Sequence, residues 1–157
     1  MTLLDENCEI ADALPINTSA GITNLGDTID THGPSVGHSA GQNLKRAFGA
    51  DAFLVVTVAE TFTSAGTPTA QFRLVSDDTA AMSASTATVH FTSAAFPLSA
   101  LTAGAVLLCV NCDGMRGVER YLGVQQIASG GTFTGGKVNV FFTSDPSAPR
   151  SYADNVS

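Results

Sequence analysis

The chain has 157 residues, of which 44% are hydrophobic and 13% are charged, and its formal net charge at pH 7 is −7. Its length is sufficient for one domain with a hydrophobic core. A soluble domain usually carries about a quarter charged residues. We therefore expect a surface covered largely by Thr, Ser, Ala and Gly, which suits lasting contact with other protein.

The distribution of charge excludes some function classes. The first 44 residues hold six acids and no base, whereas the remainder holds eight acids and seven bases. The one basic pair, Lys45-Arg46, is interpreted as a solvated pair of charges. Binding to nucleic acid needs many clustered Lys and Arg side chains, so we expect no nucleic-acid partner. No signal-peptide pattern is present at the start of the sequence. The longest apolar run, 105–110, is too short to span a bilayer, so we expect no membrane partner and synthesis in a cytoplasm.

The N-terminal third has no regular pattern. Residues 1–50 are predicted to form an extended arm and loop, with one short strand marked by Ile22 and Leu25. Within it, the Gly/Pro/Ser-rich residues 31–41 are predicted to form a loop. This third is expected to depend on neighbouring protein for its order.

From residue 51 the pattern is that of β-structure. Strands are predicted from β-branched and aromatic runs and from alternation of apolar and polar residues. Gly130-Gly131 and Gly135-Gly136 are interpreted as hairpin turns. The predicted strands occupy 53–62, 70–76, 88–92, 105–112, 121–127 and 137–143, and those at 53–62 and 105–112 read as buried.

Together these strands predict an all-β fold, a jelly-roll-like antiparallel β-sandwich. Strands recur at intervals of about 8–17 residues with Gly-rich turns between them, and no segment has helical periodicity over three turns. The sandwich core is expected at 51–144, and residues 145–157 are expected to form a flexible C-terminal tail.

The cysteines are the first candidates for chemistry. Cys109 and Cys112 form a CxxC motif, but the second cysteine leads into a turn, without the helix that lowers a thiol pKa in redox motifs. A zinc site would need two more ligands, for example Cys8 and one of His32, His38 and His90. We favour packed or semi-exposed reduced thiols, since three cysteines make no disulfide framework.

Other candidate sites are weaker. Asp77-Asp78 lacks the loop pattern of a calcium site and is interpreted as a strand-end turn whose carboxylates accept backbone N–H bonds. The three histidines have no metal-ligand spacing, and His90 is placed on the polar side of a strand. No G-x-S-x-G elbow or phosphate-binding loop is present. The sequence therefore predicts no enzyme activity, no cofactor and no metal.

Four segments carry a resemblance to a known family. FLVVTVAETFTSAGTPTAQFRLVSDD at 53–78 resembles a block in the jelly-roll type of bacteriophage capsid cement (head decoration) proteins. FPLSALTAG at 96–104, RYLGV at 120–124 and TNLG at 23–26 are similar to further segments of that family. The match spans about residues 20–144, and CVNCDGMRGVE within 105–119 departs from the family pattern.

The resemblance implies a structural virion protein on the outside of the capsid. It would cement adjacent subunits of the major capsid protein and form a homotrimer. From the residues we expect a contact arm made of Leu3, Leu4, Asp5, Glu6, Glu9 and Ile10. Two alternatives stay open: a receptor- or glycan-binding jelly roll of a tail or fibre, and a CxxC redox enzyme.

Overall fold

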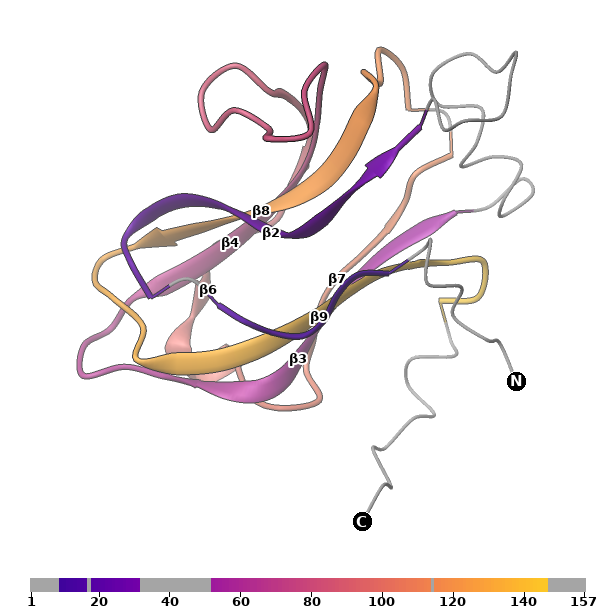
Figure 1. Cartoon of the computed structure of the whole chain (residues 1–157). Coiled ribbons are helices and arrows are strands. Elements are labelled where there is room, and N and C mark those ends of the chain that lie inside the picture. The colour runs from indigo at the N-terminus through magenta and orange to yellow at the C-terminus, as the bar shows by residue number, and fades with distance from the viewer. Residues whose placement is uncertain (1–8, 17, 32–51, 114, 147–157) are drawn as a thin grey trace.

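The computed structural model describes residues 9–16, 18–31, 52–113 and 115–146. These residues form two antiparallel sheets packed face to face (Figure 1). The first sheet has the order β1-β9-β3-β7. The second has the order β2-β8-β4-β5, with the short β6 also paired to β4. The strands are β1 (Glu9–Pro15), β2 (Gly21–Asp30), β3 (Phe53–Thr63), β4 (Thr69–Asp77), β5 (Thr88–Thr92), β6 (Phe96–Pro97), β7 (Val106–Asn111), β8 (Tyr121–Ser129) and β9 (Gly135–Thr143).

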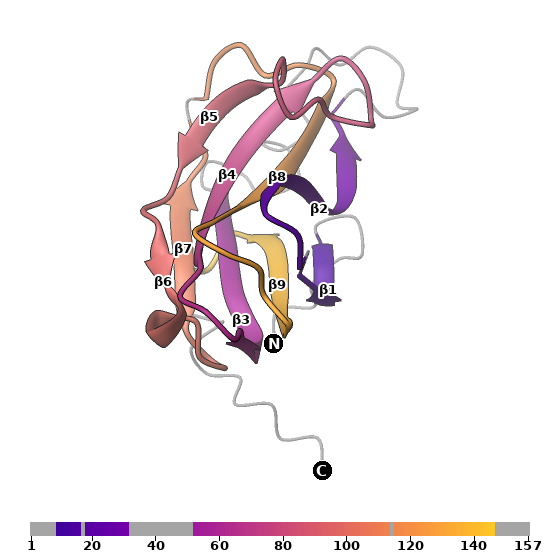
Figure 2. The ribbon, with the colours of Figure 1, turned by 90° about the vertical axis from the view of Figure 1, so that its left-hand side faces the viewer.

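The strand order is that of a jelly roll. Six of the eight connections between the described strands cross from one sheet to the other, the exceptions being β4–β5 and β5–β6, so most strands that follow one another in the chain lie on opposite sides of the core (Figure 2). The expectation of an antiparallel, jelly-roll-like all-β sandwich is confirmed. The one helical element described is a single 3₁₀ turn, Leu98–Ala100.

The core lies between the inner faces of the sheets. Alternation along each strand directs one set of side chains inward. Full burial of one such Val, Leu or Phe contributes roughly 1.5–3 kcal/mol. The innermost members are Leu54, Val56, Val58, Phe72, Leu74, Leu122, Val124, Val138, Val140 and Phe142.

Two strands before residue 51 belong to the sandwich, where the sequence predicted one short strand in an arm. β1 pairs with β9, and β2 pairs with β8 over most of its length. β1 was not predicted, because a bulge breaks the alternation of apolar and polar residues that marks a strand. Ala13 has φ 42° there, and its N–H donates to Asn139 Oδ1 at 2.6 Å.

Two other expectations are wrong. The glycines at 130–131 and 135–136 do not close a hairpin, because β8 and β9 lie in different sheets. The strand β7 is not buried on both faces, because it is the edge of its sheet and exposes Val106 and Cys109. An uncharged apolar run has the same sequence pattern whether it lies in a sheet centre or at an unprotected edge.

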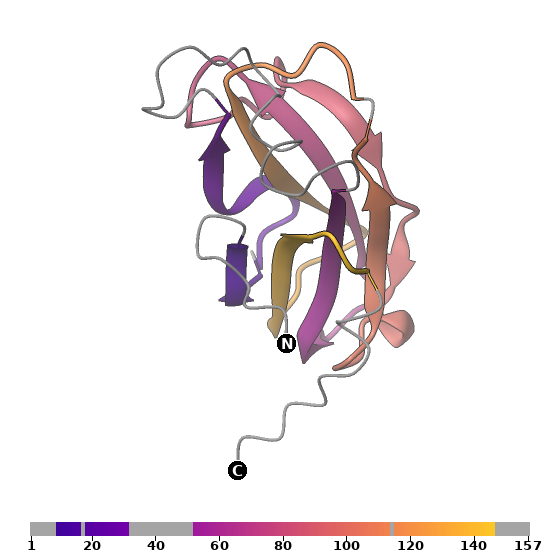
Figure 3. The same ribbon diagram turned by 90° about the vertical axis from the view of Figure 1, so that its right-hand side faces the viewer.

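Gly26 allows β1 and β2, at the edges of the two sheets, to lie close together. Gly26 of β2 has φ 61°, and a Cβ there would overlap the carbonyl oxygen of Ile10 in β1 and lie 3.0 Å from Ala11 Cβ. The absence of a side chain therefore lets the edge strands of the two sheets approach closely, as Figure 3 shows for β1 and β2.

We predict that Gly26→Ala destabilises the fold by about 2 kcal/mol or more, because it adds backbone strain to an overlap with backbone atoms. Urea denaturation measures the change. Gly66→Ala is the control, since its added Cβ meets only Ser64 Oγ at 3.9 Å. Equal denaturation midpoints for the two variants would contradict this role of Gly26.

Candidate docking surface

The outer face of the β2–β8–β4 sheet has two unlike halves. Strand register places side chains in rows across this face. One row joins Asn24, Gln125 and Arg73, and the adjacent row joins Ile22, Ile127 and Gln71. The first row is covered by protein, whereas Ile22 in the second is 39% exposed.

The β4–β5 connection, residues 78–87, covers the first row through hydrogen bonds. Arg73 donates from Nε to Gln125 Oε1 at 2.8 Å and from Nη2 to the Ala84 carbonyl at 2.7 Å. Asn24 Nδ2 donates to the Ala81 carbonyl at 2.7 Å, and Asn24 Oδ1 accepts from Gln125 Nε2 at 2.7 Å. Burial of Gln125 on an outward-facing position is thus explained, since its amide is satisfied there.

Two further anchors fix this connection. Met82 has φ 38° and is buried. Its sulfur lies 2.7 Å from the position that a Cβ on Gly123 would take, so the absence of a side chain at Gly123 makes room for it. Asp77 accepts the backbone N–H of Ser83 at 2.8 Å and of Thr79 at 3.2 Å. These backbone bonds lower the pKa of Asp77. The predicted strand-end turn at Asp77 is confirmed.

The other half of the face is uncharged. It consists of outward side chains beyond the reach of residues 78–87, which we call the uncharged patch: Ile22, Thr69, Gln71, Ile127 and Ser129. Such a surface loses little hydration energy when another protein covers it, because it contains no ion. It is the part of this face available for docking.

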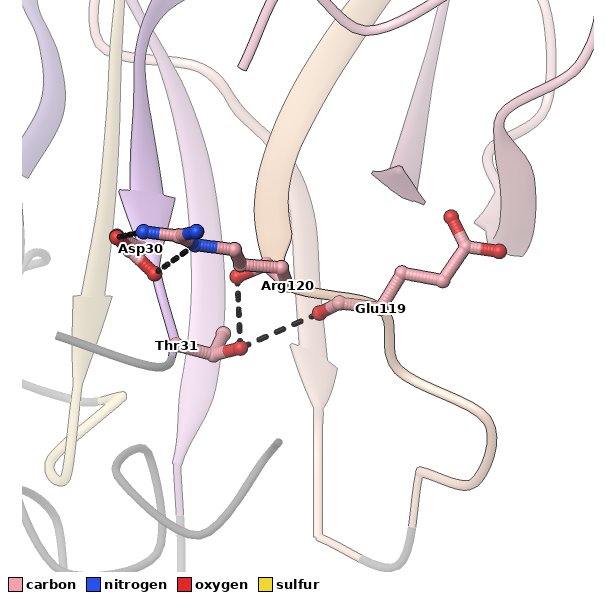
Figure 4. Close-up of polar contacts among 4 residues, drawn as sticks. All are labelled: Asp30, Thr31, Glu119 and Arg120. Carbon is pink, nitrogen blue, oxygen red and sulfur yellow. Dashed lines mark hydrogen bonds and ion pairs between the residues drawn. The ribbon is translucent and has the colours of Figure 1, made fainter. Parts of the chain in front are cut away.

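A clasp holds the end of β2 against the start of β8 (Figure 4). Arg120 binds the Asp30 carboxylate with two hydrogen bonds, at 3.2 and 2.9 Å. That bidentate contact raises the pKa of Arg120. Thr31 is fully buried beside it, and its hydroxyl donates to the carbonyls of Arg120 and Glu119. These groups therefore stabilise the fold and are not free for a ligand.

Ser76, His90 and Glu119 form the arrangement that most resembles an active site. Ser76 Oγ lies 2.7 Å from His90 Nε2 and accepts the N–H of Glu119 at 3.1 Å. The Glu119 carboxylate accepts from Thr88 Oγ1 at 2.8 Å. Ser76 is fully buried, so no substrate reaches its hydroxyl. The group joins β4, β5 and the β7–β8 connection, and its hydrogen bonds hold these segments together.

A family model named Bbp16 matches residues 13–142, from within β1 to within β9. The chain belongs to the Bbp16 family. A comparison with curated proteins found no match. The matched span covers nearly the whole sandwich, so the jelly roll described above is the Bbp16 domain of this chain.

The predicted contact arm precedes the matched span, and the structure describes it only from residue 9. Leu3, Leu4, Asp5 and Glu6 lie outside the described residues. Glu9 and Ile10 belong to β1, and Ile10 is 3% exposed and packs in the core. Including Ile10 in a contact arm is therefore wrong, because its side chain is used by the fold.

The two described cysteines lie at one end of β7. Cys109 is exposed and Cys112 is buried, and burial raises the pKa of Cys112 to about 11. Such a thiol is a poor nucleophile at neutral pH, which agrees with the packed and semi-exposed thiols expected from the sequence. Among the residues that the structure describes, no three His, Cys, Asp or Glu side chains gather as metal ligands. Cys8, His32 and His38 lie outside those residues.

No helix in the described ranges has the length and apolar character needed to cross a membrane.

We predict a pH dependence of stability that belongs to His90. Burial lowers the pKa of His90, and Glu119 only partly opposes this effect. The unfolded chain therefore binds the proton more readily, so this stability is present above about pH 6.5 and is lost as pH falls through the lower pKa of the folded protein.

Urea titrations of the wild type and of His90→Gln between pH 7.5 and 5 measure this effect. The amide oxygen of glutamine can accept a hydrogen bond from the Ser76 hydroxyl, but the amide does not titrate in this range. The wild type should lose stability more steeply than the variant. Parallel curves would show that His90 makes no contribution.

Proposed function

We propose that this Bbp16-family protein is a cement protein, which binds the outside of a bacteriophage capsid and joins adjacent subunits of the major capsid protein. No covalent bond is made or broken in this role. The observation that carries the proposal is how the described surface is divided: its charged and polar groups are largely engaged within the fold, and the uncharged patch is left for another protein.

Three features support a docking role. The ion pairs Arg120–Asp30 and Lys137–Glu60 occupy two of the four described basic residues. A third, Arg73, is held by Gln125 and Ala84. The resemblance of residues 53–78 to cement proteins lies in β3 and β4, central strands of the two sheets. A jelly roll alone does not define a function, so the surface and the resemblance are needed together.

A modest interface for each copy would be enough to hold the protein on the capsid. Many copies on one shell act together, so attachment need not be strong for each copy. The partners are the major capsid protein and further copies of this chain, in the homotrimer that the resemblance implies. Light scattering of the isolated protein tests the trimer, and a monomer at all concentrations would contradict it.

The glycan-binding alternative receives no support from the described residues. Carbohydrate sites use exposed aromatic faces, and the one described tyrosine, Tyr121, has Arg120 stacked over its ring at 5.0 Å. The chain contains no Trp.

We predict that the protein co-sediments with capsids that lack it. Deletion of residues 1–8 stops before β1 and should leave the urea midpoint close to that of the full chain. If Leu3, Leu4, Asp5 and Glu6 form a contact arm, the deletion weakens binding, and added salt weakens binding of the full chain by screening the acids. No sedimentation of the full chain would refute the cement function. Equal binding by both forms would refute the arm alone.

A substitution in the uncharged patch tests the docking face. Ile22→Lys adds a charge that must be desolvated on docking, so binding to capsids should fall while the fold is retained. Val89→Lys is the matched control, because Val89 is 45% exposed on β5, outside the patch. The same loss with both variants would indicate an effect of charge in general and not of this face.

A further inference from the structure

The four outer edges of the two sheets differ in how they are protected. An exposed edge offers unpaired N–H and C=O groups to other strands, and proteins commonly block it with bulges, charges, Gly or Pro. β1 has a bulge, two acids and Pro15. β2 has a register break around Gly26 and carries Asp27 and Asp30.

The β5–β6 edge is blocked in a different way. β5 has five residues, and the chain then leaves the ladder at Ser93, whose N–H and hydroxyl both bond to Phe72. The two-residue β6 follows and ends at Pro97. A neighbouring strand therefore finds no continuous row of donors and acceptors along this edge.

β7 is the least protected of the described edges, because its only irregularity is confined to one end. Its sequence, VLLCVN, contains no charge, Pro or Gly, and its one register shift lies at its N-terminal end, between Val56 and Thr57 of the partner strand. Val106 is 41% exposed and Cys109 is exposed. Among the described strands β7 pairs with β3 alone.

The backbone groups that face outward follow from the register. The N–H of Cys112 donates to the Ala52 carbonyl at 2.7 Å, in register with the β3–β7 pairs. Bonded and non-bonded pairs alternate in an antiparallel ladder. Val110 and Leu108 therefore bond to β3, whereas Cys109 and Asn111 direct their N–H and C=O groups away from it.

We propose that β7 accepts an extended segment of the major capsid protein as an added strand. This inference rests on the proposed cement function and names the backbone contact that would carry it. The added segment extends the β1-β9-β3-β7 sheet by β-augmentation, in which main-chain hydrogen bonds supply the affinity.

The size of the edge favours a capsid segment over a second copy of this chain. Six residues span about 20 Å. Pairing of one such strand with its copy covers only part of the roughly 800 Å² per partner that a stable complex buries. A capsid segment would be held in addition by the uncharged patch and by the other copies on the shell.

The side chains around β7 define the chemistry of the added strand. Phe141, Val55 and Cys109 form one cross-strand row on the outer face of the sheet, and the row ends at the exposed Cys109. A β-branched or aromatic residue next to Cys109 would continue this row. The partner segment is therefore an uncharged strand with an apolar residue at that position.

The test uses capsids lacking this protein and co-sedimentation of two variants of the full chain. Val106→Lys places a charge on the β7 edge, and Cys109→Pro removes an outward N–H without removing a bond to β3. Each should weaken binding by about tenfold or more, since a strand cannot be added without desolvating the charge or losing a hydrogen bond.

Matched controls separate the edge from side-chain and charge effects. Val89→Lys makes the same change on the blocked β5 edge and should bind within about twofold of the wild type, as surface changes usually have small effects. Cys109→Ser keeps the outward N–H and therefore measures the loss due to the side chain alone, which should be smaller than the loss caused by Cys109→Pro. Urea midpoints identify any variant that has lost its fold, and the Lys variant decides the matter if the Pro variant is unfolded.

Each remaining outcome overturns the proposal in a distinguishable way. If the wild type and the Val106→Lys variant bind equally, the cement function stands and the β7 edge is not used. If the wild type does not bind capsids, the cement function fails and the β7 proposal fails with it. If Val106→Lys instead dissociates an oligomer of the isolated protein, the edge belongs to a second copy.

Discussion

The structure depends on pairing between strands that are far apart in sequence. β1 lies against β9, and the Ala13 N–H reaches the Asn139 side chain across 126 residues of chain. Apart from β4 and β5, no paired strands are consecutive in the chain, so neither sheet is complete before the chain has crossed repeatedly between them. Burial of apolar side chains in the shared core offsets this loss of conformational entropy, because each crossing adds inward side chains to one apolar layer.

That arrangement determines which polar groups remain available. The crossings bring Asn24, Arg73 and Gln125 from three strands into one row, and residues 78–87 then satisfy their hydrogen bonds. The same happens at Asp30 and Arg120, which join β2 to the chain entering β8. Groups that resemble a catalytic set, Ser76 and His90 among them, are used to connect strands. On the outer face of the β2–β8–β4 sheet this leaves the uncharged patch, which supports the docking role proposed for the protein.

The sequence predicted the main strands after residue 51 well and the two N-terminal strands poorly. Strands β3, β4, β8 and β9 have strong β-branched patterns, and the predicted positions agree with the observed ones within about two residues. β1 was missed because the bulge at Ala13 breaks the alternation that marks a strand. The edge position of β7 was missed because a local pattern does not report which strand lies beside it.

The candidate surface shows the same limit. The turn at Asp77 follows from a local sequence signal. The uncharged patch does not, because Ile22, Gln71 and Ile127 become neighbours only through the register of β2, β4 and β8. The core position of Ile10 likewise depends on β1 lying beside β9. Isolated apolar residues in an acidic stretch suggested a contact arm. For Ile10, the pairing of β1 with β9 places the side chain in the core instead.

Electron cryomicroscopy of capsids decorated with this protein tests the central claim most directly, because it shows where the sandwich lies and what touches it. The account predicts density for the jelly roll on the outer surface, bridging neighbouring capsid subunits, with protein against Ile22 and Ile127. Decorated particles that carry the sandwich on a tail or fibre, or that show no density for it on the shell, would contradict the account.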